Sequence, residues 1–282
     1  MTSKLALLLG LIISMLTLQP QYGFAQDDAA SALKSAVDSP TRSSEERARD
    51  QYRHPIETLA FFGLKPDMTV VEIWPGGGWY TDILAPYLHD HGRLYAAISK
   101  GENAAEYKKK LADDPARFGK VTVTQLDPPD QMQIAPAGSA DMVVTFRNVH
   151  NWMRGGNGEA VFKAMYAALK PGGVLGVEEH RGDPGKPQDP KAASGYVRED
   201  HVITLAEEAG FILAGKSDLN ANPRDTKDYA KGVWTLPPTL RLGDTDKAKY
   251  LAIGESDRMT LKFIKPIKTA SRMASDRAGS DR

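Results

Sequence analysis

The sequence predicts an α/β fold in which a mostly parallel β-sheet carries helices on both faces. Seven short apolar segments that are typical of strands lie between residues 69 and 264. Amphipathic segments of about ten residues separate most of them, and glycine or proline marks many of the junctions. Strands that alternate with helices in this way form parallel sheets whose crossover helices cover both faces.

The predicted elements follow one another in a regular order. The strands are expected at 69–74, 93–98, 121–126, 140–146, 174–178, 211–214 and 259–264. The helices between them are expected at 81–88, 103–111, 159–169 and 201–209. Pro171-Gly172-Gly173 and Gly210 end the last two of these helices. Residues 182–195 and 219–246 are predicted to be loops or lids.

Composition narrows the class of protein. The chain has 282 residues, and its 36 basic and 36 acidic residues give a formal net charge of zero. A nucleic-acid or anionic-membrane partner therefore has no basic excess to bind. Apolar residues make up 41% of the chain, which is enough for a packed core. The absence of cysteine excludes disulfides, thiolate chemistry, cysteine-ligated zinc and iron–sulfur clusters.

The N-terminus has the pattern of a secretory signal peptide. Lys4 precedes an uncharged apolar run over residues 5–18, and Gly23 and Ala25 stand at the −3 and −1 positions of a cut before Gln26. The run is shorter than the roughly 20 residues of a membrane-spanning helix. We expect a signal peptide over 1–25 and a periplasmic or secreted protein without stable membrane insertion. An uncleaved anchor is the alternative.

The rest of the chain divides into three parts. An N-terminal helical segment is expected over 26–52, with weak helices at 27–39 and 43–51; Ser43 and Glu46 have the spacing of a capping box. The main domain is expected over 53–268 and opens with a short helix at 54–63, where Pro55 suits the first turn and Gly63 the end. Residues 269–282 are predicted to be a disordered tail.

A glycine-rich turn follows the first predicted strand. That strand brings Glu72 to its end, the sequence Trp74-Pro75-Gly76-Gly77-Gly78 follows, and the helix at 81–88 comes next. Glycines allow a ligand to approach the backbone closely, and the helix N-terminus offers free N–H groups. The pattern indicates a ligand-binding loop, with a plain tight turn as the alternative.

This segment resembles motif I of the class I S-adenosylmethionine-dependent methyltransferases, an acidic residue followed by x-Gly-x-Gly-x-Gly. Glu72 stands at the acidic position, and Trp74, Gly76 and Gly78 stand at the glycine positions. Trp74 departs from the pattern. In the family, the acidic residue contacts the methionine end of the cofactor through the loop.

The resemblance extends over residues 67–265. Residues 93–98 resemble the second strand of the family, but Ile98, followed by Ser99, takes the place of the carboxylate that binds the ribose. Asp127 falls at the position of the acid near the adenine. Residues 140–144 resemble the fourth strand, and 169–175 match the turn Leu-Lys-Pro-Gly-Gly before the fifth. Together with the signal segment, the motifs resemble a bacterial group of predicted exported methyltransferases.

The resemblance implies a Rossmann-like, seven-stranded sheet, S-adenosylmethionine as cofactor and a small molecule as methyl acceptor. The residues that it places at the cofactor are Glu72, Trp74, Pro75, Gly76, Gly77, Gly78, Tyr80, Ser99, Asp127, Arg147 and Asn148. No metal site and no nucleic-acid partner are expected.

Three residues are candidates for catalysis. His150 follows the fourth predicted strand and titrates near neutral pH, so it could take a proton from an acceptor; a structural histidine is the alternative. Glu178 and His180 end the fifth strand, and such strand ends face the site in parallel sheets. Two other functions stay open: a ligand-binding protein without turnover, and a hydrolase or lyase that uses these three side chains.

Overall fold

The computed structural model describes residues 22–267. Most of the predicted signal peptide and the predicted tail at 269–282 lie outside the described residues. Residues 22–25, with the predicted cleavage site after them, belong to helix α1 (Tyr22–Val37). Within the described range, no helix combines the length and the apolar character that a membrane span requires.

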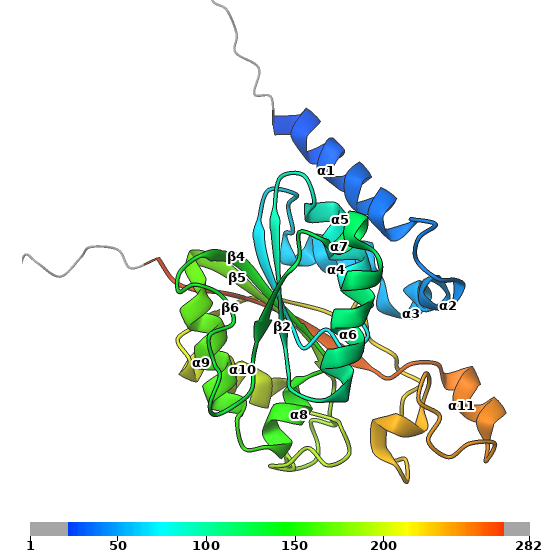
Figure 1. The fold of residues 1–282 in the computed structure, drawn as a ribbon. Helices are drawn as coiled ribbons and strands as arrows, with labels where there is room; N and C mark the ends of the chain where they lie inside the picture. Colours follow the sequence, from blue (N-terminus) through cyan, green and yellow to red (C-terminus); the bar gives the residue numbers. More distant parts are fainter. Residues whose placement is uncertain (1–21, 268–282) are drawn as a thin grey trace, which may run out of the picture.

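A seven-stranded sheet forms the centre of the molecule, in the order β3-β2-β1-β4-β5-β7-β6 (Figure 1). β7 runs antiparallel to β5 and β6, whereas the pairs from β3 to β5 are parallel. The predicted mostly parallel sheet is therefore confirmed. The strands are β1 (Thr69–Ile73), β2 (Arg93–Ile98), β3 (Thr122–Gln125), β4 (Ala140–Phe146), β5 (Leu169–His180), β6 (Ile212–Ser217) and β7 (Arg258–Ile264).

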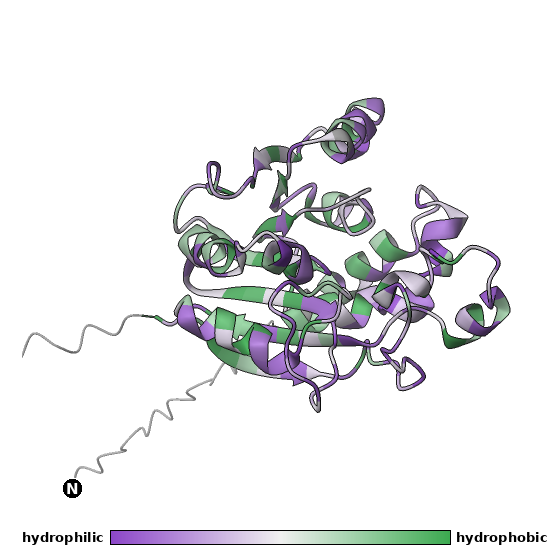
Figure 2. Ribbon diagram, turned by 90° about the horizontal axis from the view of Figure 1, so that it is seen from below, coloured by the Kyte–Doolittle hydropathy of each residue, from purple (hydrophilic) through white to green (hydrophobic). Residues whose placement is uncertain are grey.

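Helices cover both faces of the sheet because successive strand residues point to opposite sides. Val70 and Met142 pack toward one face, and their neighbours Val71 and Val143 pack toward the other. The first face carries α1, α4 (Pro55–Phe62), α5 (Thr81–Leu88), α6 (Glu102–Asp113) and α7 (Pro115–Phe118). The second carries α8 (Val149–Arg154), α9 (Gly158–Ala168) and α10 (Glu199–Glu208). Figure 2 shows the apolar strands between these more polar layers.

Short helices precede the sheet, as the sequence predicts. Helix α2 (Ser44–Ala48) has the full capping box of Ser43 and Glu46, and α3 (Asp50–Arg53) follows it directly. Pro55 opens α4, and Gly63 closes it with a φ of 86°, in the left-handed region that glycine adopts freely. Leu33 of α1 and Leu59 of α4 join the same buried cluster.

Several regions differ from the sequence prediction, among them helix α7, which was not predicted, and β6, which is longer than predicted. β5 starts at Leu169, because this residue pairs with Ala140 before an irregularity in the register, so the Leu-Lys-Pro-Gly-Gly turn belongs to the strand. Helix α8 occupies residues after the fourth strand for which no helix was predicted. The 3-10 helix η1 (Gly232–Thr235) lies inside the predicted loop at 219–246, and α11 (Lys247–Ile253) follows it.

Candidate functional site

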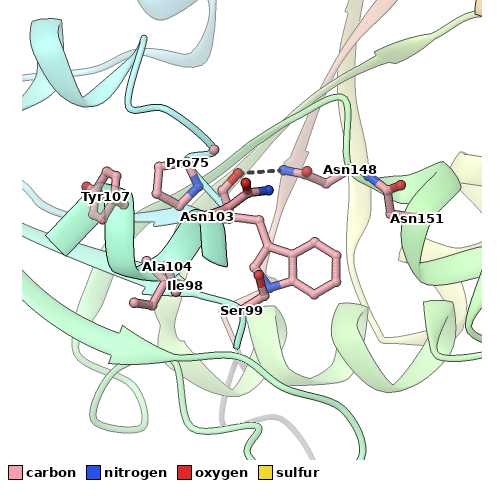
Figure 3. A pocket seen from close by; sticks show the side chains of 10 residues that line it. Pro75, Ile98, Ser99, Asn103, Ala104, Tyr107, Asn148 and Asn151 are labelled. Carbon is pink, nitrogen blue, oxygen red and sulfur yellow. Dashed lines mark hydrogen bonds between the residues drawn. The ribbon is translucent and has the colours of Figure 1, made fainter. Parts of the chain in front are cut away.

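A cavity of about 310 Å³, here named the loop cavity, lies beside the glycine-rich turn at the carboxyl ends of β1 and β2. Figure 3 shows side chains converging on it from the turn, from the end of β2, from α6 and from the segment after β4. This edge of a parallel sheet is the usual place for a ligand. Its lining residues are Trp74, Pro75, Gly76, Ile98, Ser99, Asn103, Ala104, Tyr107, Asn148 and Asn151.

Trp74 has a backbone conformation that glycine adopts more readily than other residues. Its φ is 44°, in the left-handed region that residues with a Cβ seldom adopt. The indole Nε1 donates a hydrogen bond to the Leu126 carbonyl at 2.9 Å, and the ring meets Trp152 edge-on with the centroids 6.0 Å apart. The tryptophan therefore preserves the turn and forms a wall of the cavity.

Asn148 holds the turn from the other side. Its amide Nδ2 donates to the Ile73 carbonyl at 2.9 Å. It also donates, more weakly, to the Trp74 carbonyl at 3.3 Å, the bond that Figure 3 shows. One side chain after β4 thus fixes the end of β1 and the start of the turn. Asn148 is buried, and it also lines the loop cavity.

The turn has room for a ligand at Gly76. This residue has a φ of 59°, and a Cβ built there would meet no heavy atom within 4 Å. The space is continued by a hollow of about 310 Å³ that Gly76, Gly77 and Lys110 border. A side chain at Gly76 would therefore occupy ligand space instead of striking the protein, which fits a backbone that a cofactor approaches closely.

Glu72 and Tyr80 lie behind the turn and do not line the loop cavity. Glu72 is buried and accepts a hydrogen bond from Thr81 Oγ1 at 2.6 Å. Burial raises the pKa of Glu72 to about 7. Tyr80 is also buried; it stacks on Phe146 and donates to Glu178 at 3.1 Å. Both residues support the turn, and their predicted contacts with a cofactor stay predictions.

Of the two polar residues predicted to bind the cofactor after β2 and β3, only one lines the loop cavity. Ser99 lines the loop cavity directly after Ile98, which takes the place of the family's acid, but Asp127 does not line it. Asp127 instead forms an ion pair with Lys100 and a backbone bridge with Gln131.

A second cavity of about 330 Å³ lies next to the first, at the carboxyl ends of β4 and β5. We call it the arginine cavity. Arg147, predicted to be a cofactor ligand, lines this cavity and not the loop cavity. Its lining residues are Arg49, Arg53, Arg147, His150, Asn151, His180, Val233, Trp234, Pro237, Pro238, Thr239, Glu255 and Ser256.

His150 and His180 both line the arginine cavity. His150 Nδ1 lies 3.0 Å from Glu179 Oε1, and the backbone N–H groups of both histidines also donate to this carboxylate. An ionised Glu179 keeps the proton of His150 on Nδ1, so that Nε2 is free to accept one. His180 Nδ1 contacts Ser256 Oγ at 2.6 Å, and burial, followed by nearby positive charge, holds the pKa of His180 well below its usual value.

Glu178 lies beneath this cavity, is buried and does not line it. Its Oε1 lies 2.9 Å from the Arg147 guanidinium and 3.1 Å from that of Arg258. Burial disfavours the carboxylate, but Arg258 and Arg147 outweigh that effect and lower the pKa of Glu178. Glu178 is thus placed to hold two arginines. Its predicted catalytic role stays a prediction.

Sequence reasoning missed several lining residues. Asn103 lies in the first turn of α6, which follows β2, and such positions in parallel sheets could have pointed to it. Arg49 lies between α2 and α3, and Arg53 ends α3; both contact Glu255, which lies 206 and 202 residues later in the chain. Residues 210–217 have the residue pattern of a phosphate-binding loop, but β6 extends to Ser217 and no helix follows it directly, so they do not form one.

The sequence matches no protein-family model and no curated protein significantly. Solved structures are similar in fold. An S-adenosylmethionine-dependent methyltransferase of Aquifex aeolicus is 17% identical with a TM-score of 0.53, over 84% of this chain and 98% of that one. The [4+2]-cyclase SpnF is 15% identical with a TM-score of 0.57, over 86% and 95%.

A third similar structure is phosphoethanolamine N-methyltransferase 2 of Haemonchus contortus in complex with S-adenosyl-L-methionine, 15% identical with a TM-score of 0.53, over 84% of this chain and 60% of that one. At such identities the likeness establishes the fold alone. The chain therefore has the Rossmann-like fold of the class I S-adenosylmethionine-dependent methyltransferases.

Proposed function

We propose that this protein is an exported S-adenosylmethionine-dependent methyltransferase that acts on a small molecule. The fold supports the proposal, and so does the loop cavity at the sheet edge where this fold takes its ligand. Gly76 leaves the backbone of the turn open to a cofactor, and Ser99 and Asn103 offer hydrogen-bonding side chains. When bound, S-adenosylmethionine supplies an electrophilic methyl group.

The adjacency of the two cavities carries this proposal. Asn151 lines both of them, and the neighbours Arg147 and Asn148 line one each. A methyltransferase needs its donor and its acceptor side by side, so that one bond forms as the other breaks. The loop cavity suits the cofactor, and the arginine cavity suits the acceptor.

His150 is the side chain that would accept the acceptor's proton. It lines the acceptor side, and Glu179 orients its ring. A base placed in this way removes a proton from a hydroxyl or an amine as the methyl group arrives. Glu179 acts as a positioning residue, because it is buried and reaches the cavity only through the two histidines.

Formation of S-adenosylhomocysteine tests the proposed reaction. The protein should convert S-adenosylmethionine to S-adenosylhomocysteine only in the presence of an acceptor, with one methyl group found on the acceptor by mass spectrometry. Cleavage of the cofactor without a methylated product, or an acceptor altered without consumption of the cofactor, would contradict methyl transfer.

Export is proposed from the pattern of residues 1–25. Protein isolated from its native host should begin near Gln26 and fractionate with periplasmic or secreted proteins. An intact full-length chain in the cytoplasm would contradict this part of the proposal.

A ligand-binding protein without turnover is the second candidate. Two features of the loop cavity favour it: Trp74 forms one wall, and Ile98 takes the place of the ribose-binding carboxylate. This reading predicts that a nucleoside-like ligand binds without chemical change.

A further inference from the structure

The arginine cavity has one strongly cationic wall. Arg49 lies between α2 and α3, Arg53 ends α3, and Arg147 follows β4. Arg49 Nε lies 2.6 Å from one oxygen of Glu255, and Arg53 Nε lies 3.4 Å from the other. The side chain of Arg53 is buried, and that of Arg49 is half-buried.

The carboxylates around this wall do not balance its charge. Arg258 lies beneath it and contacts both Glu255, at 3.0 Å, and Glu178, at 3.1 Å. Four guanidinium groups thus share two carboxylates, which leaves a net charge of +2; including Glu179 of the histidine pair lowers it to +1. The network consists of Arg49, Arg53, Arg147, Arg258, Glu178 and Glu255.

Burial and neighbouring positive charge both act on Arg53. Burial, followed by repulsion from Arg147, lowers the pKa of Arg53 to about 9. Buried charge is costly unless it is paired. An anionic group bound between these arginines would supply the missing negative charge, and guanidinium groups bind carboxylate and phosphate oxygens with two parallel hydrogen bonds.

Another part of the cavity wall is apolar. Val233, Trp234 and Pro237 come from the loop at 219–246 and face the same cavity. The ring of Trp234 meets His150 edge-on, with the centroids 5.9 Å apart. A ligand with an apolar body and one anionic group would therefore match both walls, and its body would lie beside His150.

A divalent cation is the competing occupant. His150, Glu179 and His180 offer ligand atoms that all lie within 4.8 Å of one another, and two histidines with a carboxylate are a known metal-binding set. However, Arg147, Arg258 and Arg53 all act on His180 electrostatically. Their positive charge repels a cation and attracts an anion.

We propose that the arginine cavity binds a small molecule that carries a carboxylate or phosphate group on an apolar body, and that this molecule is the methyl acceptor. The role as acceptor rests on the proposed methyl transfer. The binding of the anion does not, and it can be measured without S-adenosylmethionine.

Calorimetric titration of the full chain, in a chloride buffer free of phosphate and sulfate, tests the binding. The probes are benzoate, phenyl phosphate and the uncharged benzamide. Benzoate or phenyl phosphate should bind, whichever matches the natural anion, and benzamide should bind at least about tenfold more weakly. Arg49→Met and Arg53→Met should each lower the affinity for the anion by roughly 10- to 100-fold, as expected for lost charge-assisted hydrogen bonds.

Two features keep the test decisive. Arg49→Met removes a half-buried side chain, and Arg53 and Arg258 remain paired with Glu255, so this variant should stay folded. Arg154→Met is the matched control: Arg154 is exposed, rests on the Trp234 ring and lies outside the cavity lining, and its loss should leave anion affinity unchanged.

The proposal is overturned if neither anion binds the wild type, if benzamide binds equally well, or if Arg49→Met and Arg53→Met bind as the wild type does. It is also overturned if the cavity takes Zn²⁺ through His180 and no anion binds the metal-free protein. Failure of methyl transfer while the arginine-dependent binding persists would remove only the acceptor role.

Discussion

Replacing Glu72 by glutamine tests whether this carboxyl group supports the turn from behind or serves the cofactor. Glu72 is buried, and Thr81 donates to it at 2.6 Å. Glutamine keeps an oxygen that can accept this hydrogen bond but carries no charge. Burial is the largest influence on the pKa of Glu72, which rises from 4.5 to about 7, so the ionised form destabilises the fold.

The size of the effect follows from this pKa. Between pH 4.5 and 7 the folded protein retains a proton on Glu72 that the unfolded chain has lost, so stability falls as the pH rises through this window. At about 1.4 kcal/mol per pKa unit, the raised pKa of Glu72 costs roughly 1 kcal/mol of stability at pH 5 and roughly 3 kcal/mol at pH 8. Glu72→Gln removes this cost. The difference in free energy of unfolding between the variant and the wild type should therefore grow by about 2 kcal/mol from pH 5 to pH 8, in favour of the variant.

Urea unfolding at pH 5 and pH 8 measures this advantage, with the exposed Glu57→Gln as a control that should show little change. An advantage that is the same at both pH values would refute the argument, because Glu72 would then ionise alike in the folded and unfolded chains. The affinity of Glu72→Gln for S-adenosylmethionine gives a second result: a large loss would establish the predicted cofactor contact.

Two further variants separate chemistry from packing. His150→Gln should lower turnover by about 10²- to 10⁴-fold with unchanged cofactor affinity, because Nε2 is the proposed base. Steady-state kinetics measures the turnover, and calorimetry measures the cofactor affinity. Wild-type turnover in this variant would mean that another residue, or no residue, acts as the base. Gly176→Ala should destabilise the fold by about 1–3 kcal/mol in urea unfolding, since its Cβ would lie 2.6 Å from the Phe62 ring. Gly77→Ala, whose Cβ meets nothing within 4 Å, is the control, and equal losses would contradict the packing argument.

Strands and helices of the main domain could be predicted because apolar runs and helix-breaking residues coincide. α5, β2 and β4 have the predicted bounds. No helix-breaking residue marks the start of the segment 149–154. Helix α8 forms there because Val149, Trp152 and Met153 pack into the core. The strand order could not be predicted, since local sequence does not determine which strands pair.

Part of the candidate site could also be predicted, from the position of its residues after predicted strands. Gly76 and Ser99 could be placed in a cavity because each follows a strand of the parallel sheet directly. Arg53 and Glu255 could not be paired in advance, since their contact depends on how the N-terminal helices pack against the segment before β7. Glu72 matches the motif, but the sequence did not reveal that its side chain points behind the turn to Thr81.

Calorimetric titration of the purified protein with S-adenosylmethionine and S-adenosylhomocysteine tests the central claim most directly. Gly76→Val is the decisive variant, because its side chain would enter the loop cavity. Gly138→Val is a matched control: Gly138 also has a positive φ, of 63°, and nothing within 4 Å of its Cβ, but it lies outside this cavity. We predict that the wild type and Gly138→Val bind both compounds and that Gly76→Val binds neither while remaining folded. A wild type that binds neither compound, or a Gly76→Val variant with unchanged affinity, would contradict the account.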